Sequence, residues 1–133
     1  MTRRSITTVE VPGWPRPRGY ANGMIADGPV LFVAGQIGWQ PDGTFATDEL
    51  VGQFDQALAN VVAVVEAAGA GPEQIVSMTV YVTEIETYRT GLAAIGEIWR
   101  RRMGRHYPVM TLVAVPALVE PRAKVEIAAH ASI

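Results

Sequence analysis

Cysteine is absent from this chain of 133 residues. Its absence excludes disulfide bonds, thiol catalysis and metal sites built from thiolates. Only two histidines are present, His106 and His130, so a histidine-rich metal site is not expected either. The chain has no apolar run of about 18 residues and no apolar segment near its start, which argues against a membrane span and a secretory signal. We therefore expect a cytoplasmic protein that holds no metal.

Charged residues are also scarce. They make up 18% of the chain, below the usual quarter, whereas hydrophobic residues make up 49%. Lys and Arg total 11 against 13 for Asp and Glu, and the net charge of −2 does not suit a nucleic-acid surface. A small domain cannot bury so much apolar surface within itself. The composition therefore favours a homo-oligomer over the alternative of an Ala- and Val-rich monomer.

One domain is predicted over residues 1–133, and residues 1–18 are expected to form an extended arm at its start. Three prolines between Pro12 and Pro17 exclude a helix in this arm, because proline lacks the N–H and restricts the residue before it. Residues 6–9 can form a short strand ahead of the prolines.

The next elements are predicted from turn signals and periodicity. Asp27-Gly28-Pro29 indicates a hairpin turn, and residues 30–34 after it are apolar on both faces, so this strand should be central in its sheet. A period of 3.6 predicts a helix over residues 50–68. The alternation in residues 74–83 then predicts another strand.

A second helix is predicted to start at a capping box, Thr83-Glu84-Ile85-Glu86, and to run to Met103. Gly91 and Gly96 lie within it, and each costs the helix about 1 kcal/mol relative to alanine. Arg100, Arg101 and Arg102 lie in the last turn of this helix, and Arg105 lies just beyond its end. These cations are either a solvated helix end that suits the helix dipole or a contact to an anion or a partner.

Two further strands are expected at residues 107–115 and 124–131. The chain then has two strand-rich halves with one helix each. This order indicates an α+β fold in which both helices pack on one face of a mixed sheet.

Four segments carry a family resemblance: LFVAGQIG, QFDQALANVVAVVEAAG, IVSMTVYVTEIETY and RHYPVMTLVAVPALVEPRAKVEIAA. In this order they resemble the RidA/YjgF family, also described as L-PSP endoribonuclease-like proteins. The resemblance implies a chorismate mutase-like fold and a homotrimer whose three sheets form a central barrel. It also implies small-molecule clefts between subunits, where enamines and imines are hydrolysed to 2-oxo acids and ammonia without a metal or organic cofactor.

Three positions depart from what the resemblance implies. Met110 stands where the family has an arginine whose guanidinium binds the substrate carboxylate through two parallel hydrogen bonds. Ala128 replaces a glutamate that positions or activates the attacking water, and Ala93 falls near a family asparagine. Losing the arginine contact typically costs roughly 2 kcal/mol or more of binding. Small amino-acid imines should therefore bind poorly, and Met110 with Leu112 favours a larger or less charged substrate.

Three side chains are candidates for the missing catalytic group: Glu120, Glu126 and His130. Strand alternation places Glu126, Ala128 and His130 on one face, and an imidazole suits general-base work near neutral pH. Each residue also has a structural interpretation. Glu126 can pair with a basic neighbour, His130 can be a hydrogen-bonded residue near the C-terminus, and Glu120 can be a solvated turn residue.

The resemblance implies substrate contacts for a further set of residues. Tyr20 either lines the substrate-binding cleft or is an aromatic residue of the core, and Gly35 allows the backbone to approach the ligand closely. Trp39 either covers the cleft mouth or packs. Met110 and Thr111 are adjacent in a strand, so only one of them points into the pocket. The full set of candidates is Tyr20, Asn22, Gly35, Gln36, Trp39, Met110, Thr111 and Ala128.

Three functions follow from these features. The first is a RidA-like deaminase that acts on an imine, enamine or related compound other than the small amino-acid imines. The second is a non-catalytic trimer that binds a metabolite or a partner protein. The third is a ribonuclease, which the net charge and the lack of a paired His/Lys constellation make the weakest.

Overall fold

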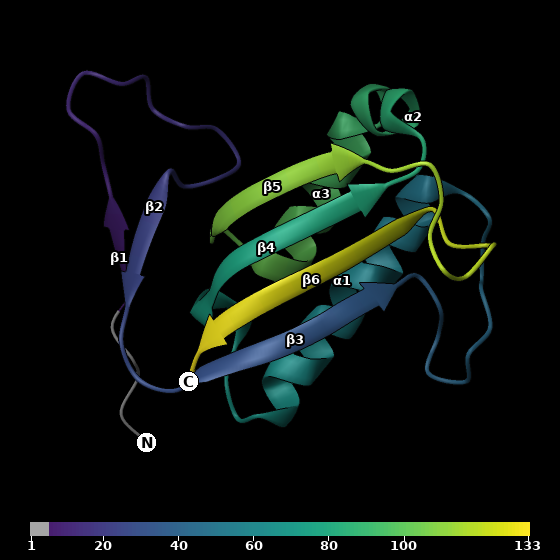
Figure 1. Cartoon of the computed structure of the whole chain (residues 1–133), viewed down its shortest axis with the longest axis horizontal. Coiled ribbons are helices and arrows are strands. Elements are labelled where there is room, and N and C mark those ends of the chain that lie inside the picture. The colour runs from purple at the N-terminus through teal and green to yellow at the C-terminus, as the bar shows by residue number, and fades with distance from the viewer. Residues whose placement is uncertain (1–5) are drawn as a thin grey trace.

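The computed structural model describes residues 6–133 of the chain, and its main feature is a four-stranded mixed sheet (Figure 1). The order across this sheet is β3-β6-β4-β5. Strands β4 and β5 are parallel, and the other neighbouring pairs are antiparallel. The four strands are β3 (Val30–Ile37), β4 (Ile75–Val82), β5 (Val109–Ala114) and β6 (Val125–Ser132).

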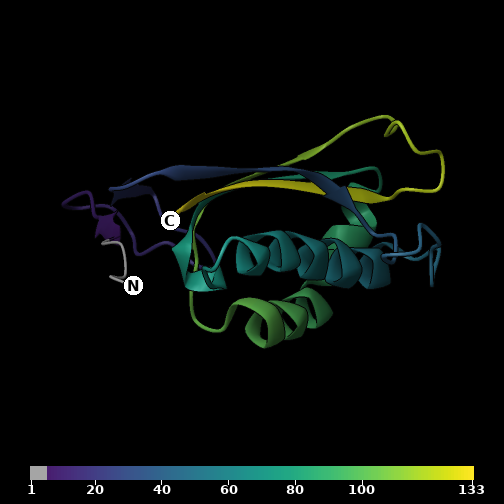
Figure 2. The same cartoon turned by 90° about the horizontal axis from the view of Figure 1, so that it is seen from below.

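The helices cover one face of this sheet and leave the other face open (Figure 2). The longer ones are α1 (Leu50–Ala67) and α3 (Leu92–Met103), and the shorter ones are α2 (Ile85–Thr90) and the 3₁₀ turn η1 (Pro72–Gln74). No helix within residues 6–133 combines the length and the apolarity needed to cross a membrane. The predicted arrangement of a mixed sheet with two main helices on one face is confirmed.

A separate two-stranded sheet precedes this layer. Strand β1 (Ile6–Val9) pairs antiparallel with β2 (Gly23–Ala26), which confirms the strand predicted at residues 6–9. The predicted hairpin at Asp27-Gly28-Pro29 is wrong, because β2 pairs with β1 while β3 pairs with β6. Gly28 turns the chain between the two sheets with a positive φ of 85°. Residues 1–5 of the predicted arm lie outside the described residues.

Strand β3 is an edge strand, so the prediction of a central strand is wrong. Val33 pairs with Ala129, points to the helix side and is buried, whereas Phe32 on the other face is 73% exposed. A strand that is apolar on both faces is usually covered on both. In a single chain the helices cover only one face of β3, and its other face is left exposed.

The second helix is divided at Gly91 into α2 and α3. A Cβ on Gly91 would lie 3.0 Å from Val51 Cγ2 of α1, so the two helices approach closely at this glycine. The predicted capping box is wrong, because Glu84 is the N-cap and makes no side-chain capping bond. The Thr83 hydroxyl instead donates to the carbonyl oxygen of Lys124 at 3.4 Å, which holds Thr83 at the end of β4.

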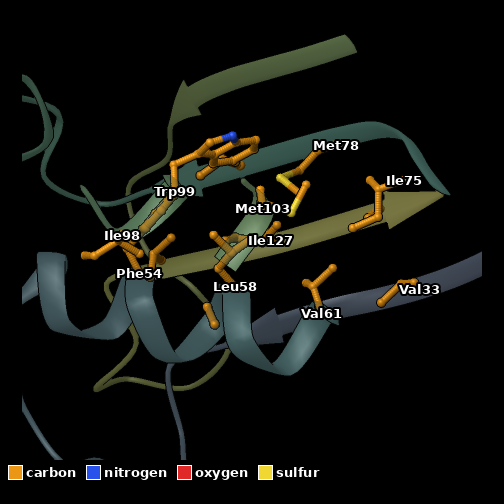
Figure 3. Close-up of a cluster of buried hydrophobic side chains, with 14 of the residues drawn as sticks. Val33, Phe54, Leu58, Val61, Ile75, Met78, Ile98, Trp99, Met103 and Ile127 are labelled. Atoms are coloured by element: carbon orange, nitrogen blue, oxygen red, sulfur yellow. The ribbon is translucent and has the colours of Figure 1, made fainter. Parts of the chain in front are cut away.

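The hydrophobic core lies between the sheet and the helices (Figure 3). Phe54 and Leu58 of α1 and Ile127 of β6 are at most 1% exposed. Each such side chain contributes about 1.5 to 3 kcal/mol of transfer free energy. Buried Gln53 donates to the carbonyl oxygens of Thr47 and Arg122 at 3.1 and 3.0 Å and accepts from the Lys124 N–H at 2.7 Å, which joins the start of α1 to the start of β6.

Candidate functional site

A cleft of about 410 Å³ opens between the edge strand β5 and helix α3. This volume falls within the range of pockets that hold small organic ligands. Met110 and Leu112 form its wall on β5, and Ile95 contributes from α3. The strand register explains the direction of Met110, since it pairs with Met78, which is 2% exposed and packs in the core. Thr111 therefore points to the opposite face, and of this adjacent pair Met110 lines the cleft.

Aromatic side chains make up much of the remaining wall: Tyr20, Tyr88, Trp99 and Tyr107. Trp99 and Tyr107 are stacked, with ring centroids 6.0 Å apart and an interplanar angle of 5°. The Trp99 indole N–H donates to the carbonyl oxygen of His106 at 3.0 Å, which fixes the ring. Burial raises the pKa of the Tyr88 phenol, so this hydroxyl keeps its proton at neutral pH. The wall can thus contact an apolar or aromatic body.

Two arginines border the same cleft, Arg18 in the loop before β2 and Arg100 on α3. A Cβ on Gly96 would lie 3.6 Å from Arg100 Nη1, so the Arg100 side chain folds back along α3 over this glycine. Neither Arg18 nor Arg100 makes an ion pair with another residue of the range 6–133.

The arginine run that closes α3 therefore divides into two parts. Arg101 and Arg102 contact the Asp55 carboxylate of α1 at 3.4 and 2.9 Å, so both are held at the helix surface. Arg100 lies at the cleft instead. For Arg101 and Arg102 the contact is structural, and for Arg100 the interpretation as an anion contact stays open.

Glu126, Ala128 and His130 lie on the open face of the sheet, opposite the cleft. They alternate with Ile127 and Ala129, which are buried toward the helices. The expectation that these three residues share one face is thereby met.

His130 is held by its neighbours on this open face. Its Nδ1 lies 2.7 Å from Ser77 Oγ, and its ring meets Phe32 edge-on at a centroid distance of 5.1 Å. Glu126 is not held by a basic neighbour within the described chain, contrary to its structural interpretation. His130 follows Glu126 by four positions on β6, which corresponds to about 13 Å along the strand. Within one chain they cannot act on the same atom.

Gly35 lies beside Glu126, because a Cβ at Gly35 would collide with the Glu126 carboxylate. The absence of a side chain therefore makes room for this carboxylate on the open face. The neighbouring Gln36 does not join them. It lines a separate hollow of about 340 Å³ together with Trp39, and its amide donates to the carbonyl oxygen of Ala34 at 3.1 Å.

Asn22 and Glu120 lie apart from both groups. Asn22 lines a hollow of about 220 Å³ within the loop that joins β1 to β2. Glu120 lies in the loop between β5 and β6, where its side chain accepts a long hydrogen bond of 3.4 Å from the Arg122 N–H. In a single chain, then, the cleft brings together only Tyr20 and Met110 of the predicted site residues.

Several residues of the cleft wall are not assigned to a site by the sequence. The helical period places Tyr88 and Trp99 in a core stripe, and local sequence does not distinguish a core stripe from a cleft wall. Arg18 and Arg100 are equally compatible with a solvated surface. Leu92 follows the same helical period and is 56% exposed at the cleft.

Comparisons with known proteins point to one family. The family model described as Endoribonuclease L-PSP matches residues 15–133. The human 2-iminobutanoate/2-iminopropanoate deaminase is 28% identical over 119 residues, which cover 89% of this chain and 82% of that protein.

Solved structures agree with this match. The Rid-family protein YyfB from Yersinia pestis has a TM-score of 0.85 and 28% identity, with 96% of this chain and 98% of that chain covered. E. coli TdcF, solved with bound serine, has a TM-score of 0.68 and 30% identity over 96% of this chain and 98% of that chain. The predicted RidA-type α+β fold is confirmed by these likenesses. The chain belongs to the Endoribonuclease L-PSP family, the group also known as RidA/YjgF.

Proposed function

We propose that this protein is an imine or enamine deaminase whose substrate is larger and less polar than the small amino-acid-derived imines. The observation that carries the proposal is the cleft beside β5. Met110 occupies its wall where the resemblance implies an arginine, and aromatic rings surround it. A relative that is 28% identical is named as a deaminase of 2-iminobutanoate and 2-iminopropanoate, which supports the reaction class.

A complete site on this proposal needs more than one copy of the chain. The candidate catalytic groups Glu126 and His130 lie on the open sheet face, whereas Met110 lies on the helix side. A sheet separates the two sets within one chain. We therefore propose a homotrimer in which a neighbouring copy brings a carboxylate or an imidazole to the cleft. The exposed apolar residues Phe32 and Val113 on the open face support such an assembly.

The proposed reaction is hydrolysis of a carbon–nitrogen double bond. Water adds to the imine carbon and forms a carbinolamine. The nitrogen takes up a proton, the C–N bond breaks and ammonia leaves, and the loss of one proton from the hydroxyl group balances this uptake and completes the C=O bond of the 2-oxo product. A general base that accepts a proton from the attacking water would be Glu120, Glu126 or His130. The reaction requires no metal or organic cofactor.

The test is ammonia release from imines generated in situ by an amino-acid oxidase. Imines derived from leucine and phenylalanine should lose ammonia faster in the presence of the protein than in its absence. The variants Glu120→Gln, Glu126→Gln and His130→Gln are then assayed separately, and at least one should abolish the acceleration. No acceleration with any imine would remove the proposal.

A non-catalytic ligand-binding trimer is the second candidate. This candidate is supported by three positions at which the resemblance implies a polar side chain and this chain has an apolar one: Met110 for arginine, Ala128 for glutamate and Ala93 for asparagine. Crystals soaked with 2-oxo acids, benzoate and aromatic amines distinguish the two candidates. A ligand held with no carboxylate or imidazole near its reactive carbon would favour binding alone.

A ribonuclease, as in the description of the family, is the weakest candidate. The net charge is −2, and Asp55 already pairs with Arg101 and Arg102 of the basic cluster. Absence of RNA cleavage in a nuclease-free preparation would remove it. Cleavage that depends on Arg100, Arg101 or Arg102 would restore it.

A further inference from the structure

We infer that Arg100, with Arg18 on the same cleft, holds an anionic group at the mouth of the cleft and so replaces the arginine that is absent from β5. The ligand is then a molecule with an apolar or aromatic body and one carboxylate. The choice of a 2-imino acid as that molecule rests on the proposed function. The binding of the carboxylate does not.

The first step is the polarity of the cleft wall. Met110, Leu112 and Ile95 offer no charge to a ligand. A carboxylate buried among them would lose its hydration without a compensating partner, which is strongly unfavourable. The apolar part of a ligand therefore faces this wall, and any carboxylate stays near the mouth.

The second step is the availability of the two guanidinium groups. Arg101 and Arg102 are already engaged by Asp55, and Arg122 by Asp48 at 2.8 Å. Arg100 and Arg18 border the cleft without an acidic partner among residues 6–133. A guanidinium binds a carboxylate through two parallel N–H donors, so either side chain suits this group.

The third step is the exposed apolar surface next to these arginines. Leu92 is 56% exposed and Tyr20 is 44% exposed on the wall of the same cleft. Gly96 has no side chain, and the Arg100 guanidinium lies over it, 3.6 Å from the position that a Cβ would take. An apolar body thus finds uncovered contact area in the same cleft that the two arginines line. Charge and shape together favour an aromatic or large aliphatic carboxylate.

The orientation also places the reacting atom. In a 2-imino acid the imine carbon is bonded directly to the carboxylate carbon, so a carboxylate at Arg100 holds this carbon at the mouth. The side chain of the substrate then extends toward Met110. On this inference the preferred substrates are imines of amino acids with aromatic or large aliphatic side chains. A catalytic group from a second copy would meet the imine carbon at the mouth.

The test uses phenylpyruvate, a stable 2-oxo acid, and its uncharged methyl ester as probes of the full-length protein. Binding is measured by calorimetry, with Trp fluorescence as a second readout because Trp99 lines the cleft. The wild-type protein should bind the acid at least tenfold more tightly than the ester. Arg100→Gln should weaken the acid at least tenfold and leave the ester unchanged, and Arg100→Lys should restore part of the loss.

Arg101→Gln is the matched control, since it removes the same charge from the next position of α3 but from a side chain that contacts Asp55. It should bind both probes like the wild type. Two results with the wild type would overturn the inference: equal binding of the acid and the ester, or no binding of the acid. An acid affinity that is unchanged in both Arg100→Gln and Arg18→Gln would also overturn it.

The inference and the proposed function fail in different ways. Binding of phenylpyruvate that depends on Arg100, without ammonia release from any imine, would keep the inference and remove the deaminase. Ammonia release that is unchanged in both Arg100→Gln and Arg18→Gln would keep the deaminase and remove the inference. Circular dichroism of each variant shows that a lost affinity is not a lost fold.

Discussion

Methionine at position 110, where the resemblance implies an arginine, removes a positive charge from the cleft wall but leaves the position and direction of strand β5 unchanged. Its pairing with Met78 keeps its side chain on the helix side of the sheet, as it would for any residue at this position of β5. The sequence identifies this change because the surrounding motif is intact. The sequence does not identify Arg100, because an arginine near a helix end is equally compatible with water, an acidic neighbour or a ligand.

The variant Met110→Arg is predicted to recover affinity for small 2-oxo acids. A guanidinium in the cleft wall offers the carboxylate two donors, so binding of 2-oxobutanoate should strengthen at least tenfold, or about 1.4 kcal/mol. Calorimetry measures the change, and Met110→Leu serves as the control because it keeps the wall apolar. Equal affinities for the two variants would show that this position does not face the ligand.

Tyr88 makes stability sensitive to alkaline pH. Burial raises its pKa above the ordinary value of 10.0, so the folded chain holds the phenol proton more tightly than the unfolded chain. This contribution is fully present below about pH 10 and is lost as the pH rises through the folded-state value. Tyr88→Phe should therefore lose less thermal stability than the wild type between about pH 9 and about pH 11. An identical loss in both proteins would contradict this assignment.

At the scale of elements, periodicity predicts where helices and strands lie better than it predicts how they join. The helix predicted over residues 50–68 is observed as Leu50–Ala67, and the strand predicted over 124–131 is observed as Val125–Ser132. The division of the second helix at Gly91 was not predicted, because the close approach of α1 at this glycine involves Val51, which is far away in sequence. Strand partners are likewise set by tertiary packing, so a turn signal at residues 27–29 did not ensure a hairpin.

Two glycines of the second helical segment should respond to alanine in opposite directions. Gly91→Ala places a Cβ 3.0 Å from Val51 Cγ2 and 3.1 Å from the Thr87 carbonyl oxygen, which should destabilise the protein by about 1 kcal/mol or more. Gly96→Ala meets only Arg100 at an ordinary 3.6 Å and should stabilise it by up to about 1 kcal/mol. Denaturant unfolding at one protein concentration measures both. A stabilising Gly91→Ala would show that packing does not cause the helix break.

At the scale of the whole molecule, the open face of the sheet is the feature that one chain leaves unexplained. Phe32 is 73% exposed on this face, and the apolar composition of β3 predicts cover on both sides. The proposed trimer would supply that cover, and it would also bring the two halves of the site together. Composition alone favoured an oligomer, but it could not show which face is buried.

Phe32→Glu is therefore predicted to break the assembly. A carboxylate in a buried interface would be unpaired, so light scattering should give three times 14.3 kDa for the wild type and a smaller mass for this variant. Val119→Glu is the control, because Val119 is a fully exposed apolar residue of the loop between β5 and β6. A wild-type protein that remains a single chain at high concentration would contradict the trimer.

The most direct test of the central claim is a crystal structure of the protein with phenylpyruvate. The predicted result is an aromatic ring against Met110 and Trp99, a carboxylate on Arg100, and a carboxylate or imidazole from a second copy facing the keto carbon. A ligand bound outside this cleft, or a ligand whose carboxylate points toward Met110, would contradict the account.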